Sequence, residues 1–114
     1  AEALSLLNAF RLANGLPALT TAGDAMAKAQ VHAEAMAAAG DLWHSNPLAA
    51  GIDGGWTAIA ENVGNDESAL DVHNLLVASS THRANMLGEY NQVGVGAAVG
   101  PDGYLYVSQV FVAR

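Results

Sequence analysis

Apolar residues recur at helical spacing through the first part of the chain, and β-forming residues dominate its end. Ala3, Leu6, Leu7 and Phe10 fall on one face of a helix. The sequence Asn-Gly-Leu-Pro at residues 14–17 ends that helix, because asparagine and glycine accept left-handed geometry and proline cannot continue a helix.

A second helix is predicted over residues 20–39, and the Gly40-Asp41 pair ends it. Small and medium apolar side chains form one continuous face of this helix. The residues on that face are Ala22, Ala25, Met26, Ala29, Ala33 and Met36.

The middle of the chain alternates between loops and short elements. Residues 45–55 are rich in Asn, Pro, Gly and Asp, which is typical of an exposed loop. Residues 56–63 are interpreted as either a short strand or an irregular segment. The polar residues 64–68 suit a helix start, so a third helix is predicted over residues 68–78, and residues 82–87 form a further helical turn.

Residues 92–99 and 104–113 are predicted to form an antiparallel hairpin. Gly-Pro-Asp-Gly between them is a turn sequence, since proline presets φ and glycine permits positive φ. Gly94 and Gly96 weaken the first strand by propensity and instead indicate a close backbone approach. Helices followed by a hairpin predict an α+β fold, with residues 1–114 as one domain.

Composition narrows the possible functions. The chain has 114 residues and a net charge of −7, so a nucleic-acid partner is not expected. No apolar run is long enough to span a bilayer, and the absence of cysteine excludes disulfides and thiolate metal sites.

Much of the hydrophobic 52% is alanine, which buries little area. The larger core candidates are Leu6, Phe10, Leu12, Leu16, Leu19, Met26, Met36, Leu42, Trp43, Trp56, Ile59, Leu70, Leu76, Met86, Leu87, Val93, Val95, Tyr106, Val110 and Phe111.

The strongest candidates for chemistry are His44, Glu61 and His82, each within a short polar signature. Two imidazoles, one carboxylate and a water molecule make a reasonable zinc site. The alternative is a polar cluster in which Glu61 hydrogen-bonds a histidine. Either interpretation requires three remote segments to meet at one cleft.

Other polar residues have simpler interpretations. Ser45, Ser79 and Ser80 could suggest a serine hydrolase, but no nucleophile elbow surrounds them. Asn62 and Asn85 are expected to brace loops through bonds to the backbone.

The remaining histidines and the basic residue next to His82 are read as structural. His32 is expected to be an interior histidine bonded to a backbone carbonyl, and His73 a solvated helix position. Arg83 is expected to contact a carboxylate such as Asp66 or Glu89.

Seven segments, in this order, resemble the CAP superfamily (cysteine-rich secretory proteins, antigen 5 and pathogenesis-related 1; SCP-like domains), particularly its short bacterial members. They are L-N-A-F-R near the start, A-Q-V-H-A-E-A-M, W-H-S, A-E-N-V-G, S-S-T-H-R-A-N-M-L, V-G-V-G and Y-L-Y-V-S-Q-V-F. The resemblance implies an α-β-α sandwich with a small antiparallel sheet between helical layers. It also implies a cleft around His44, Glu61 and His82, with Ser45, Asn62 and Ser79 beside them. Ser79 occupies the place where larger members carry a second cleft glutamate.

The resemblance therefore predicts a secreted or cell-envelope domain that binds a lipid, another small molecule or a protein at this cleft. A divalent metal, zinc above all, would be held by His44, Glu61 and His82. The alternative is a metal-assisted hydrolase acting on peptide or cell-wall substrates, in which the metal lowers the pKa of bound water.

Overall fold

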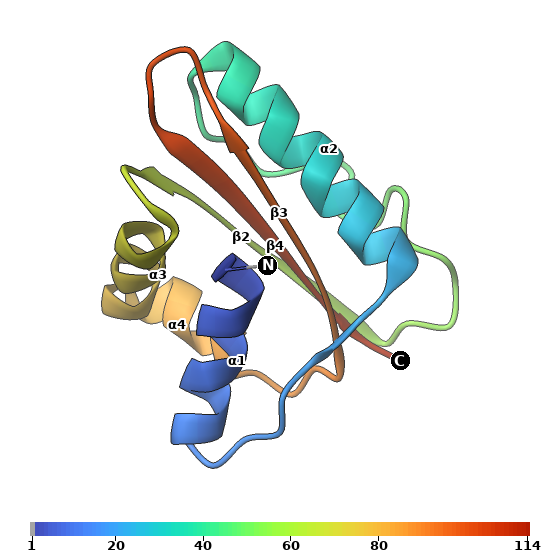
Figure 1. Cartoon of the computed structure of the whole chain (residues 1–114). Helices are drawn as coiled ribbons and strands as arrows, with labels where there is room; N and C mark the ends of the chain where they lie inside the picture. The colour runs from blue at the N-terminus through green and yellow to red at the C-terminus, as the bar shows by residue number, and fades with distance from the viewer. Residues whose placement is uncertain (1) are drawn as a thin grey trace.

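A computed structural model describes residues 2–114 as helices on both sides of a small sheet (Figure 1). The elements in chain order are α1 (Glu2–Ala13), β1 (Thr20–Thr21), α2 (Gly23–Ala39), β2 (Ala58–Asp66), α3 (Ala69–Ala78), α4 (Ser80–Met86), β3 (Gln92–Val99) and β4 (Leu105–Ala113).

The sheet has the strand order β1-β3-β4-β2. The predicted hairpin is β3 and β4, which are antiparallel, and β4 also pairs antiparallel with β2. Only the two-residue β1 runs parallel to its neighbour β3. Figure 1 shows α2 alone on one side of the sheet and α1, α3 and α4 on the other, which confirms the predicted α-β-α sandwich.

The α2 side of the sheet is held at very short range. A Cβ atom built on Gly94 would lie 2.0 Å from the carbonyl carbon of Ala25, and one built on Gly96 would lie 2.4 Å from that of Ala29. Ala25 and Ala29 are fully buried. Both glycines therefore mark the close backbone approach that the sequence indicated, because no larger residue fits between α2 and β3.

The opposite side of the sheet has the larger side chains. Leu7 of α1, Val72 and Leu76 of α3 and Met86 of α4 pack around Phe111 of β4 in one buried cluster. Several core candidates are instead exposed, because they lie on outer helix faces or on the segments that flank β2: Leu12, Leu42, Trp43, Trp56 and Leu70.

Two element boundaries differ from the expectation. Residues 20–21 are not helical: the backbone N–H groups of Thr20 and Ala22 donate to the carbonyls of Asn91 and Val93, so this stretch joins the sheet. Residues 58–66 form one continuous strand because β4 offers a partner to every residue of β2. The helix start at α3 was predicted correctly, and the hydroxyl of Ser68 caps it by accepting from the N–H of Asp71.

Candidate functional site

His44, Ser45 and Glu61 form one hydrogen-bonded cluster. His44 Nδ1 lies 2.9 Å from Glu61 Oε1. The backbone N–H of Ser45 donates to the same oxygen at 2.9 Å, and its hydroxyl donates to Glu61 Oε2 at 2.6 Å. The Glu61 side chain is 1% exposed and that of His44 is 62% exposed. Both carboxylate oxygens of Glu61 are therefore occupied and shielded by the segment that carries His44.

This arrangement fixes the histidine ring. A carboxylate only accepts hydrogen bonds, so Nδ1 of His44 carries the proton and Nε2 is left with a lone pair in the neutral ring. The His44 side chain that carries this nitrogen is largely exposed. Glu61 thus orients His44, as the carboxylate does in hydrolytic triads, and the cluster offers a base or a single metal-binding nitrogen.

The segment carrying His44 is held to α2 as well as to β2. His32 Nε2 lies 2.6 Å from the carbonyl oxygen of Trp43, and the two rings meet edge to face with centroids 5.5 Å apart. His32 is buried, which confirms the prediction of an interior histidine bonded to the backbone. Further along, Lys28 Nζ donates to the carbonyl of Ala50 at 2.6 Å.

His82 belongs to a second cluster. Its Nδ1 lies 2.8 Å from the hydroxyl of Ser79. Its carbonyl accepts from Asn62 Nδ2 at 3.0 Å, and Asn85 Nδ2 donates to Asn62 Oδ1 at 2.9 Å. Asn62 also donates to Gln109 Oε1 at 3.1 Å. The predicted bond from Asn62 to the backbone is thus confirmed, whereas Asn85 bonds a side chain instead of the backbone; together the two residues tie α4 to the sheet.

The two clusters meet β2 from different sides. Side chains of consecutive strand residues point to opposite faces. Ile59 packs against the α2 layer and Ala60 against the α1, α3 and α4 layer, so Glu61 and Asn62 continue this alternation. Within residues 2–114, no hydrogen bond or ion pair joins the His82 side chain to His44 or Glu61.

The donor set does not fit the three-ligand metal site predicted from the sequence. Among the described residues 2–114, no group of three or more His, Asp or Glu side chains is arranged to hold a metal ion. Glu61 already accepts three hydrogen bonds through its two oxygens. The Glu61–His44 hydrogen bond matches the alternative of a polar cluster. Metal binding stays a prediction.

An apolar groove of about 510 Å³ adjoins the first cluster, between α2 and the segment 43–51. Ser45 belongs both to the groove and to the cluster around Glu61. Val31 in its floor is 67% exposed, and Trp43 in its wall is 40% exposed. Its lining comprises Asp24, Ala27, Lys28, Val31, His32, Ala35, Trp43, Ser45, Ala50 and Gly51. The bonds of His32 and Glu61 to the segment thus hold one wall of the groove in place.

Two expectations about neighbouring polar residues are wrong. His73 is half-buried, with its ring edge-on to Phe10 at a centroid distance of 5.8 Å, because α1 covers this part of α3. Burial lowers the pKa of His73. Within residues 2–114, Arg83 forms no ion pair with a carboxylate; its Nη1 donates instead to the carbonyl of Val77, at the C-terminal end of α3, at 3.0 Å.

Some residues that shape these sites were not singled out from the sequence. Gln109 is 2% exposed and completes the network around Asn62. Lys28 lines the groove, and Arg11 is buried elsewhere in the molecule. A polar residue within an apolar strand, such as Gln109 in Y-V-S-Q-V-F, was the available signal, because buried polar groups require partners.

Comparison with known proteins settles the family. The family described as "CAP: Cysteine-rich secretory protein family" matches residues 4–111. The chain belongs to the CAP family. This CAP domain matches no curated protein, so the family is the level at which sequence comparison places it.

Solved structures agree with this CAP domain in fold. An outer surface protein from Borrelia burgdorferi superimposes with a TM-score of 0.84 at 14% identity, covering 97% of this chain and 89% of that one. An SCP-domain extracellular protein from Bacillus anthracis gives 0.79 at 22% identity, covering 99% and 39%. A cysteine-rich secretory protein from Staphylococcus aureus gives 0.81 at 20%, covering 99% and 38%. The CAP domain thus spans most of the first structure and under half of the other two.

No helix within residues 2–114 of the CAP domain is long and apolar enough to cross a membrane.

Proposed function

We propose that this CAP domain is a binding module that acts outside the cell or in the cell envelope and holds an apolar, lipid-like molecule in the groove over α2. The location rests on the family and on structural neighbours described as an outer surface protein, an extracellular protein and a secretory protein. The observation that carries the binding role is the apolar groove beside the His44 and Glu61 cluster.

The dimensions and chemistry of the groove suit such a ligand. Its volume of about 510 Å³ is in the range of roughly 300–1,000 Å³ usual for small-molecule sites. Ala27, Val31 and Ala35 present hydrocarbon from successive turns of α2, which suits an extended apolar chain. Lys28 in the lining and the exposed ring of His44 nearby provide polar contacts for a headgroup.

A titration with a fluorescent fatty acid tests the proposal. Val31→Glu places a charge in the floor of the groove, and we expect affinity at least about tenfold lower, equivalent to about 1.4 kcal/mol. Leu75→Glu is the matched control, because Leu75 is comparably exposed on α3, in the other helical layer. Equal binding by both variants, or no binding by the folded wild-type protein, would contradict the proposal.

The alternative of a metal-assisted hydrolase is not supported by a specific observation, because within residues 2–114 no group of three or more His, Asp or Glu side chains is arranged to hold a metal ion. Metal analysis of tag-free protein tests the zinc prediction directly. We expect less than stoichiometric zinc and an unchanged melting temperature after dialysis against a chelator. Stoichiometric zinc that is lost in a His44→Ala variant would instead restore the metal hypothesis.

A further inference from the structure

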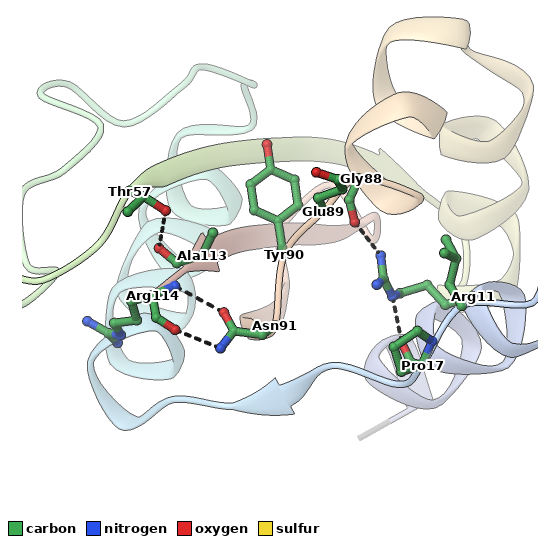
Figure 2. A pocket seen from close by; sticks show the side chains of 10 residues that line it. Arg11, Pro17, Thr57, Gly88, Glu89, Tyr90, Asn91, Ala113 and Arg114 are labelled. Atoms are coloured by element: carbon green, nitrogen blue, oxygen red, sulfur yellow. Dashed lines mark hydrogen bonds between the residues drawn. The ribbon is translucent and has the colours of Figure 1, made fainter.

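A second cavity, of about 500 Å³, lies where β2 begins and β4 ends (Figure 2). It shares no lining residue with the groove over α2. Four segments far apart in sequence line it: residues 11–17, residue 57, residues 88–91 and residues 113–114. All of its lining residues come from these segments.

A buried arginine forms one side of this cavity. Arg11 is 2% exposed. Its Nε donates to the carbonyl of Pro17 at 3.0 Å, and its Nη1 donates to those of Met86 and Gly88, both at 2.9 Å. Figure 2 shows the guanidinium between Pro17 and Gly88. Every one of these acceptors is a neutral backbone group.

Among the residues that the structure describes, no acidic side chain balances the charge of Arg11. Neither ion pair found within residues 2–114 includes Arg11. Burial lowers the pKa of Arg11 because water no longer stabilises its charged form. Charged side chains this deeply buried are normally paired. The hydrogen bonds of Arg11 use Nε and Nη1, so within the described residues Nη2 makes none.

The other cation of the lining and its amide have partners. Asn91 exchanges two hydrogen bonds with the backbone of Arg114, and the Arg114 guanidinium pairs with Asp24 at 2.7 Å. Both pairs hold the chain in place at the end of β4. Arg11 is therefore the cation available to a ligand, and Glu89 is the acid of the lining.

The rest of the wall is largely hydrocarbon. Leu16, Pro17 and Ala113 contribute aliphatic surface, and Tyr90 contributes a ring. That ring is fixed by packing against Phe111 with centroids 5.6 Å apart. Figure 2 shows Tyr90 standing between the Arg11 side and the Arg114 side of the cavity. A ligand that fits this wall has an apolar body.

We propose that this cavity binds a small organic carboxylate, whose charged group pairs with Arg11 and whose hydrocarbon part lies against Tyr90 and Leu16. Guanidinium and carboxylate form strong charge-assisted hydrogen bonds. The pairing supplies the counter-charge that Arg11 lacks.

Titration of the isotopically labelled protein with hexanoate, followed by amide NMR, tests the proposal. We expect saturable shifts at Gly88, Tyr90 and Asn91. Hexanamide, which has the same shape without the charge, should bind at least about tenfold more weakly. Equal binding of the two compounds would overturn recognition by Arg11. Shifts confined to Val31 and Trp43 would place hexanoate in the groove over α2 and also overturn the proposal.

Variants separate the role of the cavity from the structural role of Arg11. Ala113→Phe should fill the cavity and abolish hexanoate binding while Arg11 stays in place. Glu89→Gln removes the acidic side chain of the lining and should tighten binding a few-fold. If neither substitution changes the affinity for hexanoate, the proposal is contradicted. This test holds even if the direct variant, Arg11→Met, fails to fold.

Discussion

The two faces of the sheet are built on different principles. On the α2 face, the backbone at Gly94 and Gly96 lies directly against the backbone of Ala25 and Ala29. This packing leaves no room for a larger side chain at either glycine. On the other face, larger side chains pack around Phe111, and a polar network joins Asn62 to α4. The first face depends on excluded volume and the second on apolar burial together with satisfied hydrogen bonds. The difference predicts which substitutions each face tolerates.

The largest effect is expected from a methyl group on the α2 face. Gly94→Ala would place Cβ 2.0 Å from Ala25 backbone atoms, so α2 must shift. We expect the free energy of unfolding to fall by about 3 kcal/mol, measured by urea denaturation. Gly54→Ala is the control, since nothing lies within 4 Å of its added Cβ, and should change stability by less than about 0.5 kcal/mol. Similar stabilities for the two variants would refute this account of the face.

The next effect is expected from the polar network on the other face. Asn62→Ala removes the donor to His82 and Gln109 and the acceptor of Asn85. Several buried groups then lack partners, and we expect a loss of about 2 kcal/mol or more. Asn74→Ala, at an exposed position of α3, serves as the control and should be nearly neutral. A neutral Asn62→Ala would show that the network contributes little.

Ser108 and Gln109 are consecutive residues of β4, so their side chains point to opposite faces of the sheet and allow the two faces to be compared. Ser108 is fully buried and its hydroxyl has no hydrogen-bond partner among residues 2–114, so Ser108→Ala should leave stability unchanged or raise it by up to about 1 kcal/mol. Gln109→Ala, one residue on, breaks the bond from Asn62 and should destabilise the protein. Thermal melts of both variants test this contrast, which fails if Ser108→Ala is the more harmful change.

The smallest expected effect is a pH dependence of the folding stability, caused by His73 where α1 packs on α3. Burial lowers the pKa of His73 from 6.5, so the unfolded chain binds a proton more readily than the folded one. The stabilisation is complete above pH 6.5 and declines as the pH falls from there toward the lower folded pKa. Wild-type protein should therefore lose more stability between pH 8 and pH 5 than His73→Leu does. Parallel losses in denaturant titrations at the two pH values would contradict this.

The prediction from sequence was best where local patterns dominate. The Asn-Gly end of α1, the Ser68 cap of α3 and the turn of the β3–β4 hairpin each depend on residues within a few positions. The two glycines of β3 also indicated a close approach. Thr20 and Thr21 were misassigned because their partner strand lies some 70 residues away, beyond any local signal.

The sequence indicated that Glu61 could hydrogen-bond a histidine, but it did not say which one. The sequence singled out His44, Glu61 and His82, because imidazoles and carboxylates stand out in polar signatures. Which of these groups meet depends on strand alternation along β2 and on the path of the segment after α2. Those features direct Glu61 to His44 and Asn62 to α4.

The sequence by itself thus indicated most of the elements and the residues worth testing, because periodicity, caps and turns are encoded over short stretches, and its resemblance to the CAP family implied the layered fold. Tertiary structure alone decided that Glu61 bonds His44 and Ser45, that His73 is half-buried, and that Arg11 borders a cavity without an acidic partner. The physical reason is that burial and pairing are properties of surfaces brought together from distant segments. Their free energies depend on the neighbours that folding supplies.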